Sequence, residues 1–148
     1  MEAKSGFTLV EILIVVVILG ILAAIVIPQF TDASTEAKTS SLCSDLQTVR
    51  SQIELYKIQH NDDLPGTYTG VTFEEAMTQK SAQTGALSST GAFGPYLQKI
   101  PSNSFVTGED ANDVTAGTAT SPTGADGWYF NTDTGAFNAN DSAAHWQL

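Results

Sequence analysis

The sequence is poor in cysteine and in positive charge. Cys43 is the only cysteine among 148 residues, so no disulfide can form within the chain. The chain has six Lys and Arg residues against sixteen Asp and Glu residues, and no Lys or Arg follows Lys99. Nucleic acid binding requires clustered cations that neutralise phosphates, so this charge balance argues against a nucleic acid partner.

The motifs of common enzymes are also missing. The sequence contains no nucleophile elbow, no phosphate-binding loop and no Gly-rich dinucleotide turn. Its two histidines, His60 and His145, stand outside any spacing that is typical of metal ligands. These absences predict a protein that is not an enzyme.

One long apolar run stands near the N-terminus. Residues 7–27 are apolar except for Thr8 and Glu11. As an α-helix with a rise of about 1.5 Å per residue, the run spans roughly 30 Å, the thickness of the hydrocarbon core of a bilayer. A secretory signal peptide has a shorter apolar run, of about 7–15 residues, followed by small residues at a cleavage site. The run therefore predicts a transmembrane helix that stays in the mature protein.

Glu11 is the one ionisable residue in this run. A carboxylate at membrane depth costs several kcal/mol unless it lies near an interface or meets a partner, which makes it a candidate functional residue. Lys4 is the only cation that precedes it. The alternative is a carboxylate near the helix end that reaches the lipid headgroups.

Residues 4–11 read KSGFTLVE and lead directly into the apolar run. This segment resembles the start of type IV pilins and of the pseudopilins of type II secretion systems. The resemblance implies that a prepilin peptidase cleaves between Gly6 and Phe7 and that the new amine of Phe7 is N-methylated. It also implies that Pro28 kinks the helix.

The resemblance further implies that Phe7 and Glu11 act in subunit assembly. Cleavage would create an ammonium at Phe7, and this cation would give the Glu11 carboxylate a counter-ion. The pair could join an incoming subunit to a neighbour in a filament. It could also form within one chain, because the two residues are four positions apart on one helical face.

For the rest of the chain the resemblance implies an α+β fold, in which the long helix packs on a small antiparallel sheet as in pilin-like proteins. We divide the sequence into a cleaved leader (1–6), a transmembrane and filament-core helix (7–28), an amphipathic helix (29–61) and a globular domain (62–148). Gly and Pro are absent from Gln29 to His60. An apolar stripe with helical spacing in this segment should hold the globular domain; it consists of Leu42, Leu46, Val49, Ile53 and Tyr56.

Local patterns predict further elements in the globular domain. Thr72 and Glu75 fit a capping box, which starts a helix at Phe73 that runs to about Lys80. Residues 128–131 and 136–139 read as two strands of a hairpin. Residues 81–94 and 107–127 read as loops, the second a long one on the surface.

Calcium is the one candidate cofactor that the sequence suggests. Oxygen-bearing side chains concentrate in the C-terminal third, and the resemblance adds that many major pseudopilins bind calcium in a C-terminal loop. The residue types suit a hard cation, but their spacing does not name the ligands. The candidates are Asp110, Asn112, Asp113, Asp126, Asn131, Asp133, Asn138, Asn140 and Asp141.

The sequence thus predicts a structural subunit of a helical filament assembled at the bacterial inner membrane. The first choice is a type II secretion pseudopilus that drives protein export, and the alternative is a type IV pilus for adhesion, motility or DNA uptake. A monomeric membrane-anchored binding module is the second alternative. The expected partners are identical and related pilin-like subunits, a prepilin peptidase and an inner-membrane assembly platform, with nucleic acid only for a DNA-uptake pilus. We expect a single-pass protein whose globular domain lies in the periplasm, or outside the cell in an assembled filament.

Overall fold

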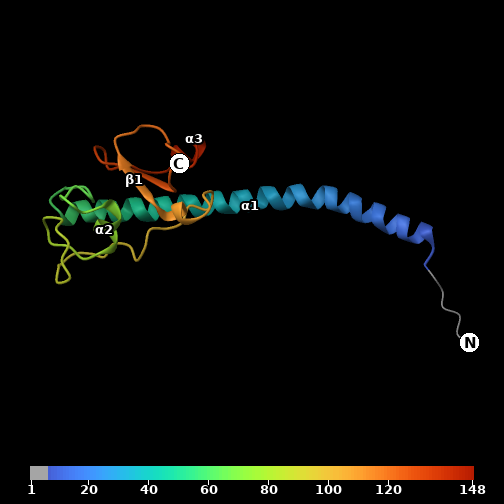
Figure 1. Ribbon diagram of the computed structural model, residues 1–148, viewed down its shortest axis with the longest axis horizontal. Coiled ribbons are helices and arrows are strands. Elements are labelled where there is room, and N and C mark those ends of the chain that lie inside the picture. Colours follow the sequence, from blue (N-terminus) through green and yellow to red (C-terminus); the bar gives the residue numbers. More distant parts are fainter. Residues whose placement is uncertain (1–6) are drawn as a thin grey trace, which may run out of the picture. The chain divides into compact units, whose positions relative to one another are not determined.

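The computed structural model describes residues 7–148 and has an α+β fold, as predicted. Two compact units divide the chain, one ending at Ala37 and the other running from Lys38 to Leu148. The elements in chain order are helix α1 (Leu9–Gln59), helix α2 (Phe73–Thr78), the 3-10 helix η1 (Glu109–Asn112), strands β1 (Val114–Gly117), β2 (Trp128–Asn131) and β3 (Phe137–Ala139), and helix α3 (Ala143–Trp146) (Figure 1).

The first unit contributes the N-terminal part of α1, and its apolar side chains are exposed. Val15 and Ile18 leave 52% and 51% of their surface uncovered, and Phe30 leaves 75%. This helix is long and apolar enough to cross a membrane, and none of its most apolar window is buried within the chain. Such a surface needs lipid or other apolar side chains around it.

The second unit has a hydrophobic core on the C-terminal part of α1. All five residues of the predicted stripe, from Leu42 to Tyr56, are at most 2% exposed, which confirms that prediction. Aromatic side chains from α2 and the sheet complete the core. The Phe73 ring lies 4.5 Å from that of Phe130, and Trp128 stacks on Phe137 at 5.3 Å between ring centroids.

The sheet is mixed rather than antiparallel, with the strand order β1-β2-β3. The predicted hairpin is confirmed, because β2 and β3 pair antiparallel, although β3 begins at Phe137. β1 pairs parallel with β2, so the prediction of a wholly antiparallel sheet was wrong. The 107–127 segment is also not a plain surface loop, because it contains η1 and β1.

Gly127 shows why this segment lies close to the sheet. A Cβ atom at Gly127 would lie 2.2 Å from the carbonyl oxygen of Ala111, so only glycine lets the two backbones approach. Its N–H donates to the carbonyl of Asp110 at 2.8 Å, and the next residue, Trp128, donates to the carbonyl of Asp113 at 3.1 Å. These bonds hold η1 beside the start of β2.

The helix ends depart from the sequence prediction by a few residues. α1 ends at Gln59 rather than residue 61, because Asn61 and Asp62 adopt positive φ angles of 56° and 71° that end the helix. The capping box of Thr72 and Glu75 is present, and α2 ends at Thr78 rather than Lys80. Two further features were not predicted: α3, and the isolated bridges of Ser81 to Leu87 and Phe93.

Candidate functional site

The start of α1 holds the Glu11 carboxylate in a second capping box. Glu11 Oε2 accepts hydrogen bonds from the backbone N–H of Thr8 at 2.8 Å and from its hydroxyl at 2.7 Å. The Glu11 N–H donates to the Thr8 hydroxyl oxygen at 3.2 Å, which closes the reciprocal arrangement. Phe7, the residue before the box, is 84% exposed, whereas Gly6 lies outside the described residues.

Sequence reasoning missed this partner of Glu11, although the same Thr-x-x-Glu spacing correctly predicted the box at Thr72 and Glu75. The box uses only Oε2, so within the described chain Oε1 accepts no hydrogen bond. One carboxylate can therefore cap its own helix and still present an oxygen to an external cation. The choice between a partner within the chain and one in a neighbouring subunit stays open for that second oxygen.

Pro28 lies inside α1, which continues past it. Proline lacks the N–H that would bond to the carbonyl four residues earlier, which is the usual cause of a helix kink. The kink at Pro28 stays a prediction.

The carboxylates among the oxygen-rich residues of the C-terminal third do not gather in one group within residues 7–148. Within residues 7–148 no three His, Cys, Asp or Glu side chains group in a way that could hold a metal ion. Several candidate oxygens already accept hydrogen bonds from the chain itself. Asn131 Oδ1 accepts from the N–H groups of Asp133 and Thr134 at 3.0 and 2.9 Å, and the Asp126 carboxylate accepts from the Thr115 hydroxyl.

The last three candidate ligands along the chain also accept hydrogen bonds from other residues of the chain. Asn138 Oδ1 accepts from Arg50 at 3.1 Å, and Asn140 Oδ1 accepts from the N–H of Thr123 at 2.8 Å. Asp141 accepts from the Asn103 amide at 2.9 Å, and its other oxygen lies 2.5 Å from His145 Nδ1. Calcium needs several oxygens that converge on one point, whereas these oxygens accept hydrogen bonds from donors in different parts of the chain.

Burial of Asp141 opposes its ionisation, but its hydrogen bonds with Asn103 and His145 outweigh that effect and lower the pKa of Asp141.

The other histidine, His60, also contacts residues of the chain itself. His60 is fully buried, with Nδ1 2.9 Å from the carbonyl of Tyr56 and Nε2 2.9 Å from the Ser81 hydroxyl. Sequence reasoning assigned neither histidine a partner, because neither the contacts of His60 with Tyr56 and Ser81 nor that of His145 with Asp141 belongs to a known motif.

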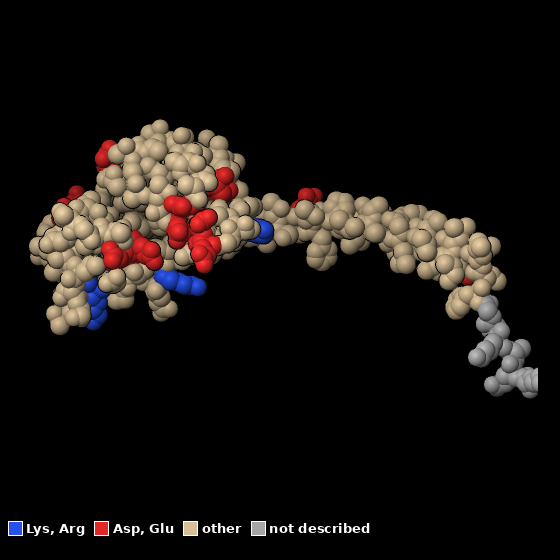
Figure 2. All heavy atoms as spheres, viewed as in Figure 1, with Lys and Arg blue, Asp and Glu red and all other residues tan. Residues whose placement is uncertain are grey.

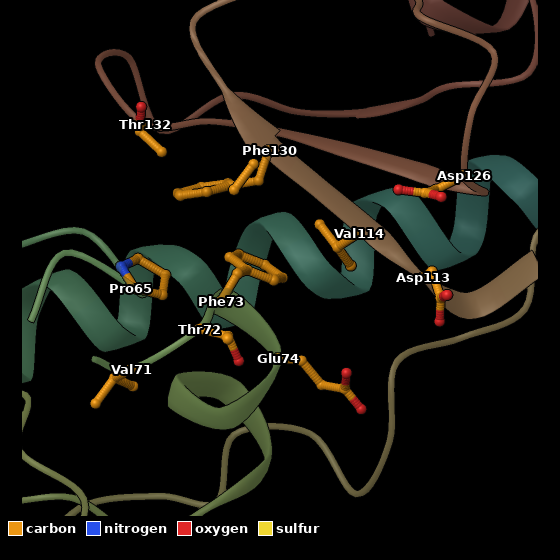
Figure 3. A pocket seen from close by; sticks show the side chains of 12 residues that line it. Pro65, Val71, Thr72, Phe73, Glu74, Asp113, Val114, Asp126, Phe130 and Thr132 are labelled. Carbon is orange, nitrogen blue, oxygen red and sulfur yellow. The ribbon is translucent and has the colours of Figure 1, made fainter. Parts of the chain in front are cut away.

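A hollow of about 480 Å³ lies between the first turn of α2 and the strands β1 and β2. Phe73 and Phe130 line its apolar side, and Figure 3 shows Glu74, Asp113 and Asp126 around it. Its lining residues, all in the described chain, include no histidine, cysteine or lysine. Acidic side chains also outnumber basic ones on the face of the second unit drawn in Figure 2.

Comparison with known proteins finds matches to the N-terminal segment and to a longer stretch of the chain. The family model described as the prokaryotic N-terminal methylation motif matches residues 1–27. Type II secretion system core protein G of Pseudomonas aeruginosa is 38% identical over 98 residues, which cover 66% of each chain. The protein of the same name from Klebsiella pneumoniae is 32% identical over 101 residues, covering 68% of this chain and 69% of that one.

A fimbrial protein of Pseudomonas aeruginosa is 43% identical over a shorter stretch of 54 residues, which covers 36% of this chain and 35% of the fimbrial one. No solved structure matches the chain. The secretion-system relatives thus extend over about two thirds of this chain, well beyond the apolar run.

Proposed function

The chain belongs to the family of type II secretion system core protein G, and on this basis we propose that it is the major structural subunit of a secretion pseudopilus that drives protein export. The observation that carries the proposal is the alignment with core protein G of Klebsiella pneumoniae over 69% of that protein's length. The methylation motif over residues 1–27 and the exposed apolar helix supply the processing and membrane segments that such a subunit needs. The role is structural, without catalysis.

The geometry of α1 explains how such a subunit would assemble. Before assembly the helix anchors the chain in the inner membrane, where lipid covers side chains such as Val15 and Ile18. In a filament the same side chains pack against the helices of neighbouring copies, so the apolar surface stays covered throughout. The second unit keeps its own core from Lys38 onward and need not unfold during this transfer.

A type IV pilus is the second candidate function, because the fimbrial protein of Pseudomonas aeruginosa is 43% identical over 54 residues. That match covers about a third of each chain, whereas the match to core protein G covers about two thirds. A monomeric membrane-anchored binding module would need the apolar helix, but it would give no reason for the Gly6-Phe7 junction or for Glu11.

Deletion of the gene tests these functions against each other. A pseudopilus subunit should be required for export, so the deletion should strand folded exoproteins in the periplasm and leave surface fibres and twitching motility unchanged. Fractionation of secreted enzymes and electron microscopy of the cell surface measure the two effects, and the restored wild-type gene is the control. Loss of fibres with normal secretion would favour the pilus, and no change in either would favour the binding module.

Processing gives a second expected outcome. In cells that contain the peptidase, the mature chain should begin at Phe7 with a methylated amine, because Gly6 precedes the apolar run directly. Mass spectrometry of the intact protein purified from membranes measures both the cleavage and the added methyl group. A chain that still begins with Met1 in those cells would refute processing and remove the ammonium expected to pair with Glu11.

A further inference from the structure

We propose that hydrogen-bond donors of the chain itself, above all the Arg50 guanidinium, hold the C-terminal part of the second unit in place, as a bound divalent cation would otherwise do. Folding and assembly of this subunit therefore do not need calcium. The clause on assembly rests on the proposed function. The clause on folding rests on the contacts of the second unit alone.

Arg50 connects three parts of the second unit. Its Nε donates to the carbonyl of Phe137 at 2.9 Å, Nη2 donates to Asn138 Oδ1 at 3.1 Å, and Nη1 donates to the carbonyl of Leu148 at 3.0 Å. A guanidinium is always protonated and carries its N–H donors in a rigid plane, so it can bind several oxygens at once, as a metal ion does. Arg50 comes from α1, directly after the fully buried Val49, and is itself half-buried.

Asn103 forms a second closure. Its side-chain amide donates to the carbonyl of Gly127 and to Asp141 Oδ1, both at 2.9 Å, and its Oδ1 accepts from the N–H of Phe105 at 2.9 Å. Asn103 is only 1% exposed. The other oxygen of Asp141 is bound to His145, whose ring packs on Phe105 at 4.2 Å between centroids. This closure ties α3 to the segment before β2.

These bonds compete directly with a cation for the same oxygens. Calcium takes about six to eight oxygen ligands at roughly 2.3–2.6 Å. A cation that used Asn138 Oδ1 would share that oxygen with Arg50 and lie beside its fixed positive charge, and one that used Asp141 would share its oxygens with the donors of Asn103 and His145. Asp110, Asp113 and Asp133 remain exposed, but they do not join a group of three.

Thermal unfolding of the full chain in detergent tests the calcium clause. Trp128 is fully buried, so its fluorescence reports unfolding of the second unit. We expect equal Tm values in millimolar calcium and in EDTA. A ligand that binds only the folded state must raise Tm, so a rise of more than about 4 °C with calcium would overturn the proposal.

Variants of Arg50 test the positive part of the proposal. Arg50→Lys keeps the charge but lacks the planar group whose three nitrogens donate to three separate oxygens, so we expect its Tm to fall, and that of Arg50→Met to fall further. Lys57→Met, which removes an α1 cation paired only with the exposed Glu54, is the control and should leave Tm unchanged. Should Arg50→Met fail to fold, Asn138→Ala removes one of the three acceptors and should still lower Tm. A Tm equal to wild type in both Arg50→Lys and Asn138→Ala would overturn the role of Arg50.

Whether assembly needs calcium is tested by the yield of sheared filaments from cells grown with calcium or with a chelator. Equal yields support the clause, and loss of filaments only in the chelator overturns it. If no filament forms in either medium, the proposed function has failed. The melting measurements need no filament and still decide whether Arg50 replaces a cation.

Discussion

Replacing Glu11 with leucine should leave the chain in the membrane and abolish filament assembly. Leucine is cheaper than a carboxylate in lipid, so insertion should persist or improve. The variant loses the oxygen that the ammonium of Phe7 would meet after cleavage, so subunits should no longer join. Membrane fractionation measures the first step, and the yield of sheared filaments measures the second. A normal filament yield would remove Glu11 from the mechanism.

The capping box at Thr8 requires two matched controls for this result. Glu11→Gln keeps an oxygen that can accept from the Thr8 N–H but removes the charge, so it should fail in assembly as Glu11→Leu does. Thr8→Val removes the hydroxyl that bonds to Glu11 at 2.7 Å but leaves the carboxylate, and it weakens the helix start by about 1 kcal/mol. It should assemble. Normal assembly of Glu11→Gln together with failure of Thr8→Val would assign Glu11 to helix capping instead of charge pairing.

Features that depend on neighbouring residues could be predicted from the sequence. The stripe from Leu42 to Tyr56 follows from helical periodicity, and the hairpin of β2 and β3 follows from aromatic runs around a Gly-containing turn. The capping box at Thr8 is equally local and was open to prediction. It was missed because the cost of a charge at membrane depth directed the search for a partner of Glu11 to cations.

Features that depend on distant residues could not be predicted. β1 contains one large apolar residue, Val114, and its parallel pairing with β2 leaves no local pattern. Arg50 lies 87 residues before Phe137, whose carbonyl it binds, so the sequence shows the oxygens of the C-terminal third without the donors that occupy them. Residue types alone therefore suited calcium without naming its ligands, and the fold shows which donors those oxygens accept from.

Leu46→Asp should unfold the second unit. Leu46 is 1% exposed and belongs to the core cluster, so the variant buries a carboxylate among apolar side chains. Loss of the leucine and burial of an unpaired charge together cost about 5 kcal/mol or more, which is comparable to the whole stability of a small domain. Limited proteolysis of the detergent-solubilised chain should then cleave the second unit rapidly.

Gln47→Asp adds the same charge one position along α1, where the side chain is exposed, and should resist the protease as the wild type does. Insertion depends on the apolar run up to Ile27, so Leu46→Asp should still fractionate with the membrane and yet yield no filaments. By these two readouts it would match Glu11→Leu, but the causes differ. Glu11→Leu should keep a protease-resistant second unit, because Glu11 lies outside the unit that begins at Lys38. Equal protease resistance of Leu46→Asp and Gln47→Asp would mean that the stripe on α1 does not hold the second unit together.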